Sequence, residues 1–453
     1  MGIFKAYDIR GLYPAELDEH LAFQIGAAFG SLNPGTIAVG CDTRVSSPSL
    51  KAQLIRGICS TGSDVVDIGL TTTPMVVFAV KQLHGDGGVN VTASHNPKEY
   101  NGFKLFDRAA MPISYESGIA QVEALVERGD YQKGAGASSF RSIAGEYLAF
   151  LTARVKPEKR LRIVLDGSNG PAGRYAPAVF RQLGMTVHEL NCTPDGTFPG
   201  HDPDPTKAES LAEAQRQVRE VGADLGFVYD GDGDRLAVIA EDGRAIESRR
   251  IFSLLAQQML SERPGAKVVH DVLMSQMAID TITRDGGVPI ASKVGHTYIA
   301  QRMQEEAAEL GGELSGHYYF NETHFADDAI FASLKVLELV AREGRPISVL
   351  VQDFPEYLTA NVRVAVTDAE KLPFIASLRA DLERDGYAIE TLDGVKVRFE
   401  HGWALFRASN TEPKLSIAYE SRDTGEFNRI KRFVESIIAR VPQGDEGRHT
   451  GRG

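Results

Sequence analysis

The sequence predicts an α/β protein of several domains that ends in a smaller α+β domain. Short apolar strand patterns alternate with helix patterns through roughly the first 350 residues, which favours layered α/β folds. After about residue 358 the pattern changes to short strands set between two helices. The length suggests about three domains of ordinary size.

The first part of the chain is predicted from apolar runs and their periodicity. Ile37–Gly40 is a short buried strand, 50–62 is a helix and 65–68 is the next strand. A further strand at 161–165 ends in the turn residues 166–170. Two later strands repeat this arrangement: 223–229 and 267–270.

The last part begins with Val362, Val364 and Val366, whose alternation with other residues indicates a strand. A helix is predicted from about Ala369. Three short strands follow: 395–399, 404–407 and 415–419. The final helix carries its apolar residues on one face: Phe427, Ile430, Phe433, Val434, Ile437 and Ile438.

A stretch of small residues at 133–139 indicates a joint between domains. The Gly-rich polar tail 442–453 is expected to be disordered. The predicted domains cover residues 1–139, 140–246, 247–358 and 359–441.

The composition is that of a globular protein, with 43% hydrophobic and 24% charged residues among 453. A net charge of −12 argues against nucleic-acid and anionic-membrane partners, which need a basic surface. The longest apolar run is Met75–Val80, too short to span a bilayer, and the N-terminus has no signal-peptide pattern. Three widely spaced cysteines fit a reducing compartment, so we expect a cytoplasmic protein.

The clearest chemical motif is the run Asp230-Gly231-Asp232-Gly233-Asp234-Arg235, which directly follows an apolar strand. Glycines let such a loop curl, so that three alternating carboxylates converge and raise one another's pKa unless a cation neutralises them. Oxygen ligands suit Mg²⁺ or Ca²⁺. The alternative is a solvated acidic turn. An EF-hand is excluded because Arg235 occupies the position of the sharp-turn glycine and a strand precedes the loop.

The second motif is Thr92-Ala93-Ser94-His95-Asn96-Pro97, a loop of small and polar residues suited to holding a phosphate or a reactive hydroxyl. A capped helix start is the alternative interpretation. Ser94 and His95 are not expected to face each other, because chain neighbours rarely do.

Two further motifs provide groups that bind hydroxyls and phosphates. Gly312–His317 places Glu313, Ser315 and His317 at alternating positions, which suits a polyol such as a sugar, or a plain turn. The run 407–411 combines a guanidinium, hydroxyls and an amide, which suits a phosphate, or a polar hairpin loop. By default, most of four other basic residues are expected to be surface charges: Arg10, Arg44, Lys104 and Lys293.

In this order the motifs resemble the α-D-phosphohexomutase superfamily, most closely its bacterial phosphomannomutase/phosphoglucomutase branch. The resemblance runs from Phe4–Gly11 to Thr411 and includes Tyr100–Lys104 and Lys293–His296. It implies four domains around a central cleft, three related α/β domains and a mobile C-terminal α+β domain. It also implies a mutase that interconverts hexose 1-phosphates and 6-phosphates, with Mg²⁺ and a hexose 1,6-bisphosphate as activator and intermediate.

The resemblance also assigns roles. Ser94 is the catalytic serine, which rests as a phosphoserine and binds Mg²⁺ together with Asp230, Asp232 and Asp234. Lys104, or a histidine, is the candidate general base. The implied catalytic set comprises Ser94, His95, Lys104, Arg10 and His317. The implied substrate-binding set comprises Tyr7, Arg235, Lys293, His296, Glu313, Ser315, His317, Arg407, Ser409, Asn410 and Thr411.

The expected partners are small sugar phosphates, and the sequence is silent on oligomeric state. Phosphoglucosamine mutases usually carry Gln where Leu314 stands and Asp where His296 stands, so the hexose-phosphate branch is favoured over them. One departure is Leu273, at a position that is commonly basic in members that use both mannose and glucose. A non-catalytic sugar-phosphate-binding regulator is the alternative from another class. A haloacid-dehalogenase-type phosphatase is disfavoured, because the Thr or Val it needs after its nucleophilic Asp does not follow Asp232 or Asp234 in that pattern.

Overall fold

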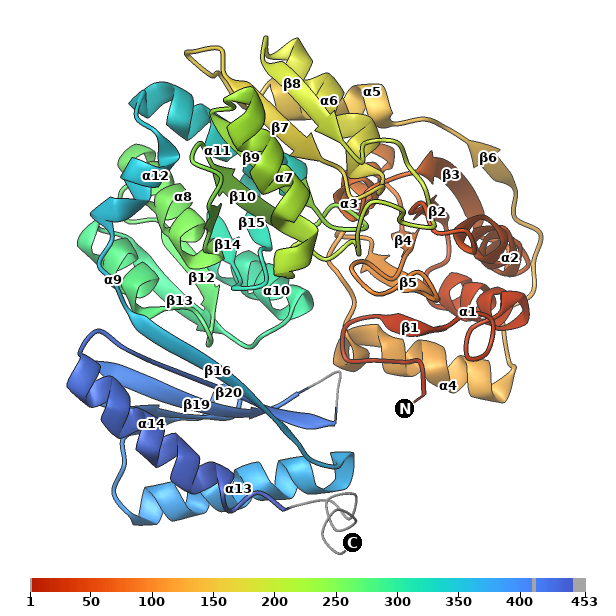
Figure 1. The fold of residues 1–453 in the computed structure, drawn as a ribbon. Helices are drawn as coiled ribbons and strands as arrows, with labels where there is room; N and C mark the ends of the chain where they lie inside the picture. The colour runs from red at the N-terminus through yellow and green to blue at the C-terminus, as the bar shows by residue number, and fades with distance from the viewer. Residues whose placement is uncertain (1, 410–412, 443–453) are drawn as a thin grey trace, which may run out of the picture.

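The computed structural model describes residues 2–409 and 413–442, and these form four sheets with helices packed against them (Figure 1). The expectations for Asn410, Thr411 and the tail beyond Pro442 lie outside the described residues. Three α/β units and a C-terminal α+β unit confirm the predicted fold class.

The first sheet has the order β1-β5-β4-β2-β3-β6. Its centre is parallel, whereas β5 runs antiparallel to β4 and β1 antiparallel to β5. Its strands are β1 Ile9–Leu12, β2 Thr36–Cys41, β3 Asp64–Leu70, β4 Gly87–Val91, β5 Tyr100–Asp107 and β6 Ser138–Phe140. Its helices are α1 Glu19–Leu32, α2 Ser47–Cys59, α3 Thr73–Leu83, the π-helix η1 Tyr115–Ile119 and α4 Ala120–Arg128.

One local difference from the sequence expectations has a simple cause. Helix α2 begins before the predicted residue 50 because Pro48 fits its first turn, and it ends at Cys59, short of residue 62. The stretch 133–139, where the sequence predicts a joint between domains, contacts the end of α2 through the hydrogen bond from Gly134 N to Ser60 O (2.9 Å) and continues into β6, which pairs with β3.

The second sheet has the order β11-β10-β9-β7-β8. Its β9–β10 hairpin carries residues 230–235, here called the aspartate loop. Its strands are β7 Arg162–Asp166, β8 Thr186–Leu190, β9 Leu225–Tyr229, β10 Leu236–Ala240 and β11 Ala245–Ile246. Its helices are α5 Ala144–Thr152, α6 Ala172–Gln182 and α7 Ala208–Val221.

The third sheet has the order β13-β12-β14-β15. Residues 312–317, here called the sugar loop, form its β14–β15 turn. Its strands are β12 Lys267–Asp271, β13 Val288–Ser292, β14 Leu310–Gly312 and β15 Tyr318–Phe320. Its helices are α8 Ser248–Glu262, α9 Gln276–Arg284, α10 His296–Glu306, η2 Asn321–Thr323, α11 Ala329–Glu343, α12 Ile347–Leu350 and η3 Val351–Asp353.

The fourth sheet is antiparallel, with the order β16-β20-β19-β18-β17. Its strands are β16 Leu358–Ala365, β17 Ile389–Glu390, β18 Val395–Arg398, β19 Gly402–Ala408 and β20 Lys414–Ser421. Its helices are α13 Asp368–Arg384 and α14 Thr424–Ile438. On α14, Ile430, Val434 and Ile437 are buried, as the apolar face predicts.

The packing divides the chain unequally. One apolar core joins α3 of the first unit to the second and third units, while the fourth has a core of its own. A small cluster of Val272, Trp403, Leu405 and Ala418 joins the third unit to the fourth. None of the described helices is both long and apolar enough to cross a membrane.

Candidate active site

Residues 92–97, here called the serine loop, connect β4 to β5 at the edge of the first unit that meets the second. Ser94 is buried and has a φ of +50°, a left-handed conformation that costs a non-glycine residue about 1–3 kcal/mol. Its Oγ donates a hydrogen bond to Asp230 Oδ2 (2.7 Å) and lies 3.2 Å from His95 Nδ1. The expectation that Ser94 and His95 do not face each other is therefore wrong, because the left-handed turn brings the two side chains together.

The aspartate loop gathers its three carboxylates at one point. Asp230, Asp232 and Asp234 are each 0% exposed, and one oxygen from each lies within 4.8 Å of the others. Asp230 Oδ1 shapes the turn by accepting hydrogen bonds from the backbone N–H of Gly233 (2.9 Å) and Asp234 (3.0 Å). Gly233 has a φ of +75°, which explains why glycine stands there.

Lys104 of β5 neutralises part of this charge. Its Nζ lies 2.8 Å from Asp232 Oδ2 and also donates to Asp234 Oδ2, and the residue is 4% exposed. Burial alone would lower the pKa of Lys104, but Asp232 and Asp234 raise it. In this arrangement Lys104 holds its proton. The default expectation that it is a surface charge is wrong.

The carboxylates differ in their electrostatics. Burial, followed by repulsion from Asp234 and Asp232, raises the pKa of Asp230 well above its usual value. Burial acts in the same direction on Asp234, but the charges of Lys104 and His317 outweigh it and hold the pKa of Asp234 well below its usual value. Asp230 therefore favours its neutral form unless a cation beside it stabilises the carboxylate.

The donor set fits a hard divalent cation. Within the described chain, Asp232 Oδ1 and Asp234 Oδ1 are buried without a hydrogen-bond partner, although Asp234 Oδ1 lies 3.4 Å from His317 Nε2. Buried oxygens of this kind are costly unless a ligand satisfies them. Three convergent carboxylates are ligands that Mg²⁺ accepts. The loop follows strand β9, consistent with the exclusion of an EF-hand.

The sugar loop lies against the aspartate loop. Leu236 N donates to Gly316 O (3.0 Å), and Arg235 Nε lies 3.2 Å from His317 Nε2. His317 Nδ1 lies 2.9 Å from Glu313 Oε2 and 2.8 Å from Ser315 Oγ. Burial would lower the pKa of His317, but Asp234 and Glu313 together raise it to about 10.

Glu313 is buried and held by hydrogen bonds from Tyr319 OH (2.7 Å) and Gly295 N (2.9 Å). Despite burial, the contacts with His317 and Tyr319 lower the pKa of Glu313 to about 2. His296, at the start of α10, has its pKa lowered to about 4, chiefly by burial.

Tyr7 and Arg10 extend the site from the first unit. Tyr7 OH donates to Val294 O (2.7 Å), and its ring meets the ring of His296 edge-on. Arg10 Nη1 donates to Asn96 Oδ1 (2.7 Å) in the serine loop. Lys293 Nζ lies 5.2 Å from the centre of the Tyr298 ring.

The described part of the phosphate-loop motif approaches the third unit. Arg407 is 6% exposed and pairs with Asp393, whose Oδ2 also accepts Val294 N (3.0 Å). Arg407 Nη2 lies 3.2 Å from Asp393 Oδ2 but has no hydrogen-bond partner among the described residues. Lys371, for which no sequence motif predicts a role, donates to Ser409 O (2.8 Å).

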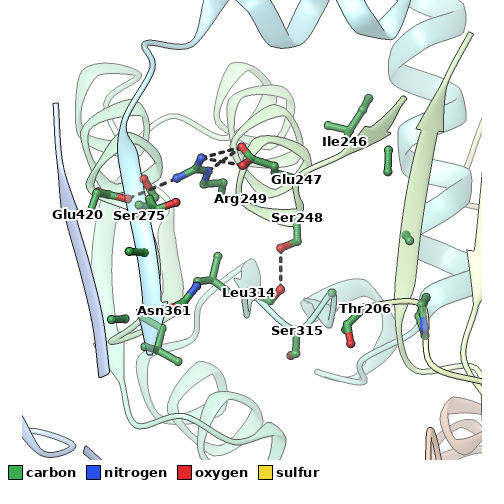
Figure 2. A pocket seen from close by; sticks show the side chains of 18 of the residues that line it. Thr206, Ile246, Glu247, Ser248, Arg249, Ser275, Leu314, Ser315, Asn361 and Glu420 are labelled. Atoms are coloured by element: carbon green, nitrogen blue, oxygen red, sulfur yellow. Dashed lines mark hydrogen bonds and ion pairs between the residues drawn. The ribbon is translucent and has the colours of Figure 1, made fainter. Parts of the chain in front are cut away.

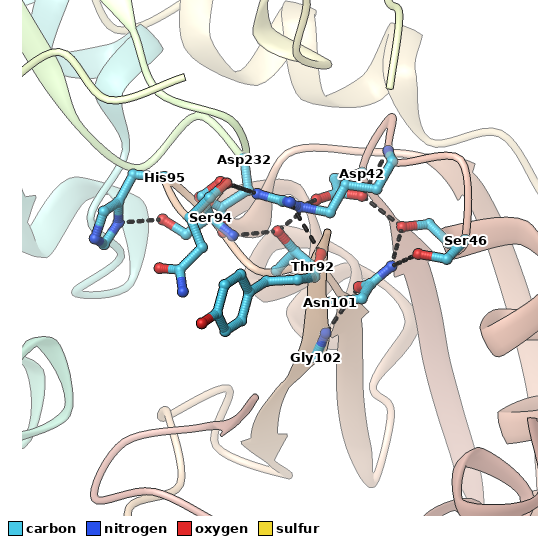
Figure 3. A network of polar contacts seen from close by, with 12 residues as sticks. Asp42, Ser46, Thr92, Ser94, His95, Asn101, Gly102 and Asp232 are labelled. Carbon is cyan, nitrogen blue, oxygen red and sulfur yellow. Dashed lines mark hydrogen bonds and ion pairs between the residues drawn. The ribbon is translucent and has the colours of Figure 1, made fainter. Parts of the chain in front are cut away.

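Three residues that support these loops were missed or misjudged: Thr73, Arg44 and Asp42. Thr73 donates to Asp232 Oδ2 (2.5 Å) and accepts from Asn90 Nδ2 (2.8 Å), so it holds the aspartate loop from the first unit. Arg44 is 0% exposed, so its default placement on the surface is wrong. Figure 3 shows the polar network around Ser94 to which Asp42 and Thr92 belong. No local pattern marks any of these roles, because each depends on a contact far along the chain.

A cavity of about 330 Å³ lies behind the sugar loop, between the second, third and fourth units (Figure 2). Leu314 and Ser315 form one wall, and Leu273 lies on another beside the Trp403 cluster. Ser94 and the three aspartates do not line it. Leu273 thus packs in an apolar junction, which a lysine at this position would interrupt.

Comparison with known proteins gives a consistent result along the chain. Four models of phosphoglucomutase/phosphomannomutase match in order: alpha/beta/alpha domain I (1–133), domain II (145–243), domain III (247–357) and the C-terminal domain (362–437). A phosphomannomutase/phosphoglucomutase of Pseudomonas aeruginosa is 38% identical over 97% of this chain and 96% of its own length. A phosphomannomutase of Salmonella typhimurium is 38% identical over 97% and 99%.

Among solved structures, a phosphoglucomutase/phosphomannomutase family protein from Burkholderia thailandensis superposes with a TM-score of 0.90. It is 33% identical and covers 97% of this chain and 98% of its own. All four domain models and these near-full-length likenesses agree. The chain therefore belongs to the phosphoglucomutase/phosphomannomutase family.

Proposed function

We propose that this chain is a phosphohexomutase that interconverts hexose 1-phosphate and hexose 6-phosphate, with mannose or glucose as the sugar. The reaction proceeds through a phosphoserine at Ser94 and a hexose 1,6-bisphosphate. The observation that carries the proposal is the 2.7 Å contact of Ser94 Oγ with Asp230, made between loops of the first and second units. The names of the near-full-length relatives agree with it.

The charge at the site must be balanced before a phosphate can rest on Ser94. A phosphoserine carries about −1.5 to −2 near neutral pH. Lys104, Arg235 and His317 bring positive charge to the same place. When bound by Asp230, Asp232, Asp234 and a phosphate oxygen, Mg²⁺ supplies further neutralisation of the transferring phosphoryl group.

The transfer exchanges one phosphate ester bond for another. The bond between Ser94 Oγ and phosphorus breaks as a bond forms from a substrate hydroxyl oxygen to phosphorus. The hydroxyl proton passes to a base, and Ser94 Oγ recovers a proton. His95 Nδ1 lies 3.2 Å from Oγ, but burial holds the pKa of His95 well below its usual value, so it is neutral and returns a proton to Oγ only after it has taken one from the substrate hydroxyl. The base is Lys104 or a histidine, and Lys104 serves only when its carboxylate partners are otherwise engaged.

The bisphosphate must reverse its orientation in the site between the two transfers. Glu313 and Ser315 are proposed to hold hydroxyls, and Arg407 and Ser409, with Asn410 and Thr411, to hold the phosphate that does not react. Arg407 Nη2, which lies 3.2 Å from Asp393 Oδ2 but has no hydrogen-bond partner within the described part of the chain, supports a phosphate there. A site that binds the hydroxyls of the sugar ring and one distal phosphate accepts the bisphosphate in two orientations, with either its 1-phosphate or its 6-phosphate at the distal position.

A paired assay tests the proposal. Mannose 1-phosphate and glucose 1-phosphate are supplied separately with Mg²⁺ and a catalytic amount of the hexose bisphosphate. We expect turnover of at least one substrate by the wild type and background rates from Ser94→Ala. Unchanged turnover in Ser94→Ala rejects the assignment. Binding without turnover favours the regulatory alternative, and a much higher rate on glucosamine 6-phosphate favours a phosphoglucosamine mutase.

A further inference from the structure

Arg44 is a buried arginine that the proposed reaction does not use. It lies just after β2 and all of its guanidinium is enclosed. Nη1 donates to Pro97 O (2.7 Å) and Tyr100 O (3.0 Å), and Nη2 donates to Ser94 O (2.7 Å) and Asn96 O (2.6 Å). All four acceptors are backbone carbonyls of the segment from Ser94 to Tyr100, which leads from β4 into the first residue of β5.

The remaining N–H completes the set. Arg44 Nε donates to Asp42 Oδ2 (3.1 Å), so each of its five donors has a partner. The guanidinium is planar and rigid, so it fixes the spacing of the carbonyls that it binds. A lysine ammonium at the same place lacks that fork and cannot reach four carbonyls in one plane.

Asp42 reaches the same loop by a second route (Figure 3). Its Oδ2 accepts from Thr92 Oγ1 (2.7 Å), and Thr92 Oγ1 in turn accepts from the backbone N–H of Ser94 (2.8 Å). Ser94 is therefore held on both of its backbone polar groups, at O by Arg44 and at N by Thr92. These two contacts bracket the residue whose φ is +50°.

The held conformation determines the direction of the reactive oxygen. Ser94 Oγ meets Asp230 only while its backbone stays in the left-handed turn. Packing alone does not call for a buried guanidinium, because an apolar side chain of similar volume would avoid its desolvation. The pattern of its partners, four carbonyls of a single loop, indicates a different purpose.

We propose that Arg44 is a positioning residue for phosphoryl transfer. It keeps the serine loop in the conformation that aims Ser94 Oγ, and the phosphate it carries, at the aspartate trio. Asp42 and Thr92 complete the clamp. This role rests on the proposed mutase function. It acts on the transfer steps, not on the affinity for the sugar.

Three variants test the role. Arg44→Lys keeps the charge but loses the fork, and Thr92→Val keeps the shape but loses the contact with Ser94 N. Leu54→Ala is the matched control, because Leu54 is buried in the core of the same unit and its truncation lowers stability without touching the serine loop. For each variant, kcat and KM for glucose 1-phosphate are measured, with the fraction of Ser94 phosphorylated after treatment with glucose 1,6-bisphosphate.

We expect Arg44→Lys to lower kcat by about 10²-fold, the scale of a 1 Å misplacement, with KM nearly unchanged and slower phosphorylation of Ser94. We expect Thr92→Val to lower kcat by about tenfold. Leu54→Ala should melt earlier while keeping kcat per folded molecule. If Arg44→Lys does not fold, Thr92→Val decides. A folded Arg44→Lys, or failing that Thr92→Val, with wild-type kcat and phosphorylation overturns the role. A wild type that turns over no sugar phosphate instead rejects the proposed function.

Discussion

Lys104→Met removes a buried positive charge from between two aspartates. We expect it to destabilise the metal-free protein and to increase the stabilisation that Mg²⁺ provides. Methionine nearly matches the length of the lysine stem, so the packing beside β5 is largely kept. What is lost is the ammonium at 2.8 Å from Asp232 and its bond to Asp234.

The size of the effect follows from burial. The Lys104 side chain is 5% exposed and its two partners are 0% exposed, so solvent does not replace the lost charge. Removing one partner of a buried ion pair typically destabilises a protein by about 3–5 kcal/mol. Because Mg²⁺ binds the same carboxylates, it should restore much of this loss in the variant. In the wild type the lysine already supplies part of that stabilisation.

The assay is thermal unfolding in EDTA and in excess MgCl₂. Lys51→Met is the matched control, since Lys51 pairs with Asp67 at 2.7 Å in the same unit but with side chains 14% and 26% exposed. Such a pair contributes about 0–1 kcal/mol, so that variant should melt close to the wild type in both buffers. Equal melting of Lys104→Met and Lys51→Met in EDTA, or equal gains from MgCl₂, would refute the reasoning.

Three further outcomes are expected. Asp232→Asn should raise the Mg²⁺ concentration for half-maximal activity by at least about tenfold, because a buried carboxylate ligand, whose Oδ1 has no hydrogen-bond partner among the residues that the structure describes, loses its negative charge; an unchanged titration contradicts the metal assignment. Glu313→Gln should raise KM for the sugar phosphate by about 10- to 100-fold, and an unchanged KM removes Glu313 from the sugar site. Burial lowers the pKa of His201, but its 3.1 Å contact with Asp166 raises it above 6.5 overall. The decrease in the free energy of unfolding caused by His201→Gln should therefore be greatest below about pH 6.5 and should disappear as the pH rises through the pKa of His201 in the folded protein. Denaturation measured across pH 5–9 tests this, and a decrease that grows with pH contradicts the raised pKa.

Much of the fold follows from local pattern. The apolar runs at 37–40 and 65–68 lie inside β2 and β3, and the run at 161–165 overlaps β7 except for Leu161, because a buried strand needs only a short run of apolar residues. The aspartate loop was visible for a similar reason, since its carboxylates and glycines are adjacent in the chain. The antiparallel placement of β5 beside β4 had no such signal, because it depends on pairing and not on period.

Site residues that stand together in a short motif could be predicted from the sequence. Residues that act through one contact with a distant part of the chain could not. Ser94 was visible through its loop, whereas its contact with His95 depends on a left-handed backbone that composition does not reveal. Arg44 and Thr73 act across 50 or more residues of sequence, at Ser94 and Asp232. A charged residue between two elements looks alike in sequence whether it ends on the surface or, like Arg44, in the interior.

The central claim is that a phosphate on Ser94 is the group transferred. In the most direct measurement, the protein is phosphorylated with glucose 1,6-bisphosphate that carries label in its phosphates, and the label is located by peptide mass analysis. Unlabelled glucose 1-phosphate is then added with Mg²⁺. The account predicts one phosphate on the peptide that contains Ser94, none on Ser94→Ala, and its discharge to the sugar at least as fast as kcat. Label on another residue, or label on Ser94 that the sugar phosphate does not remove, would contradict it.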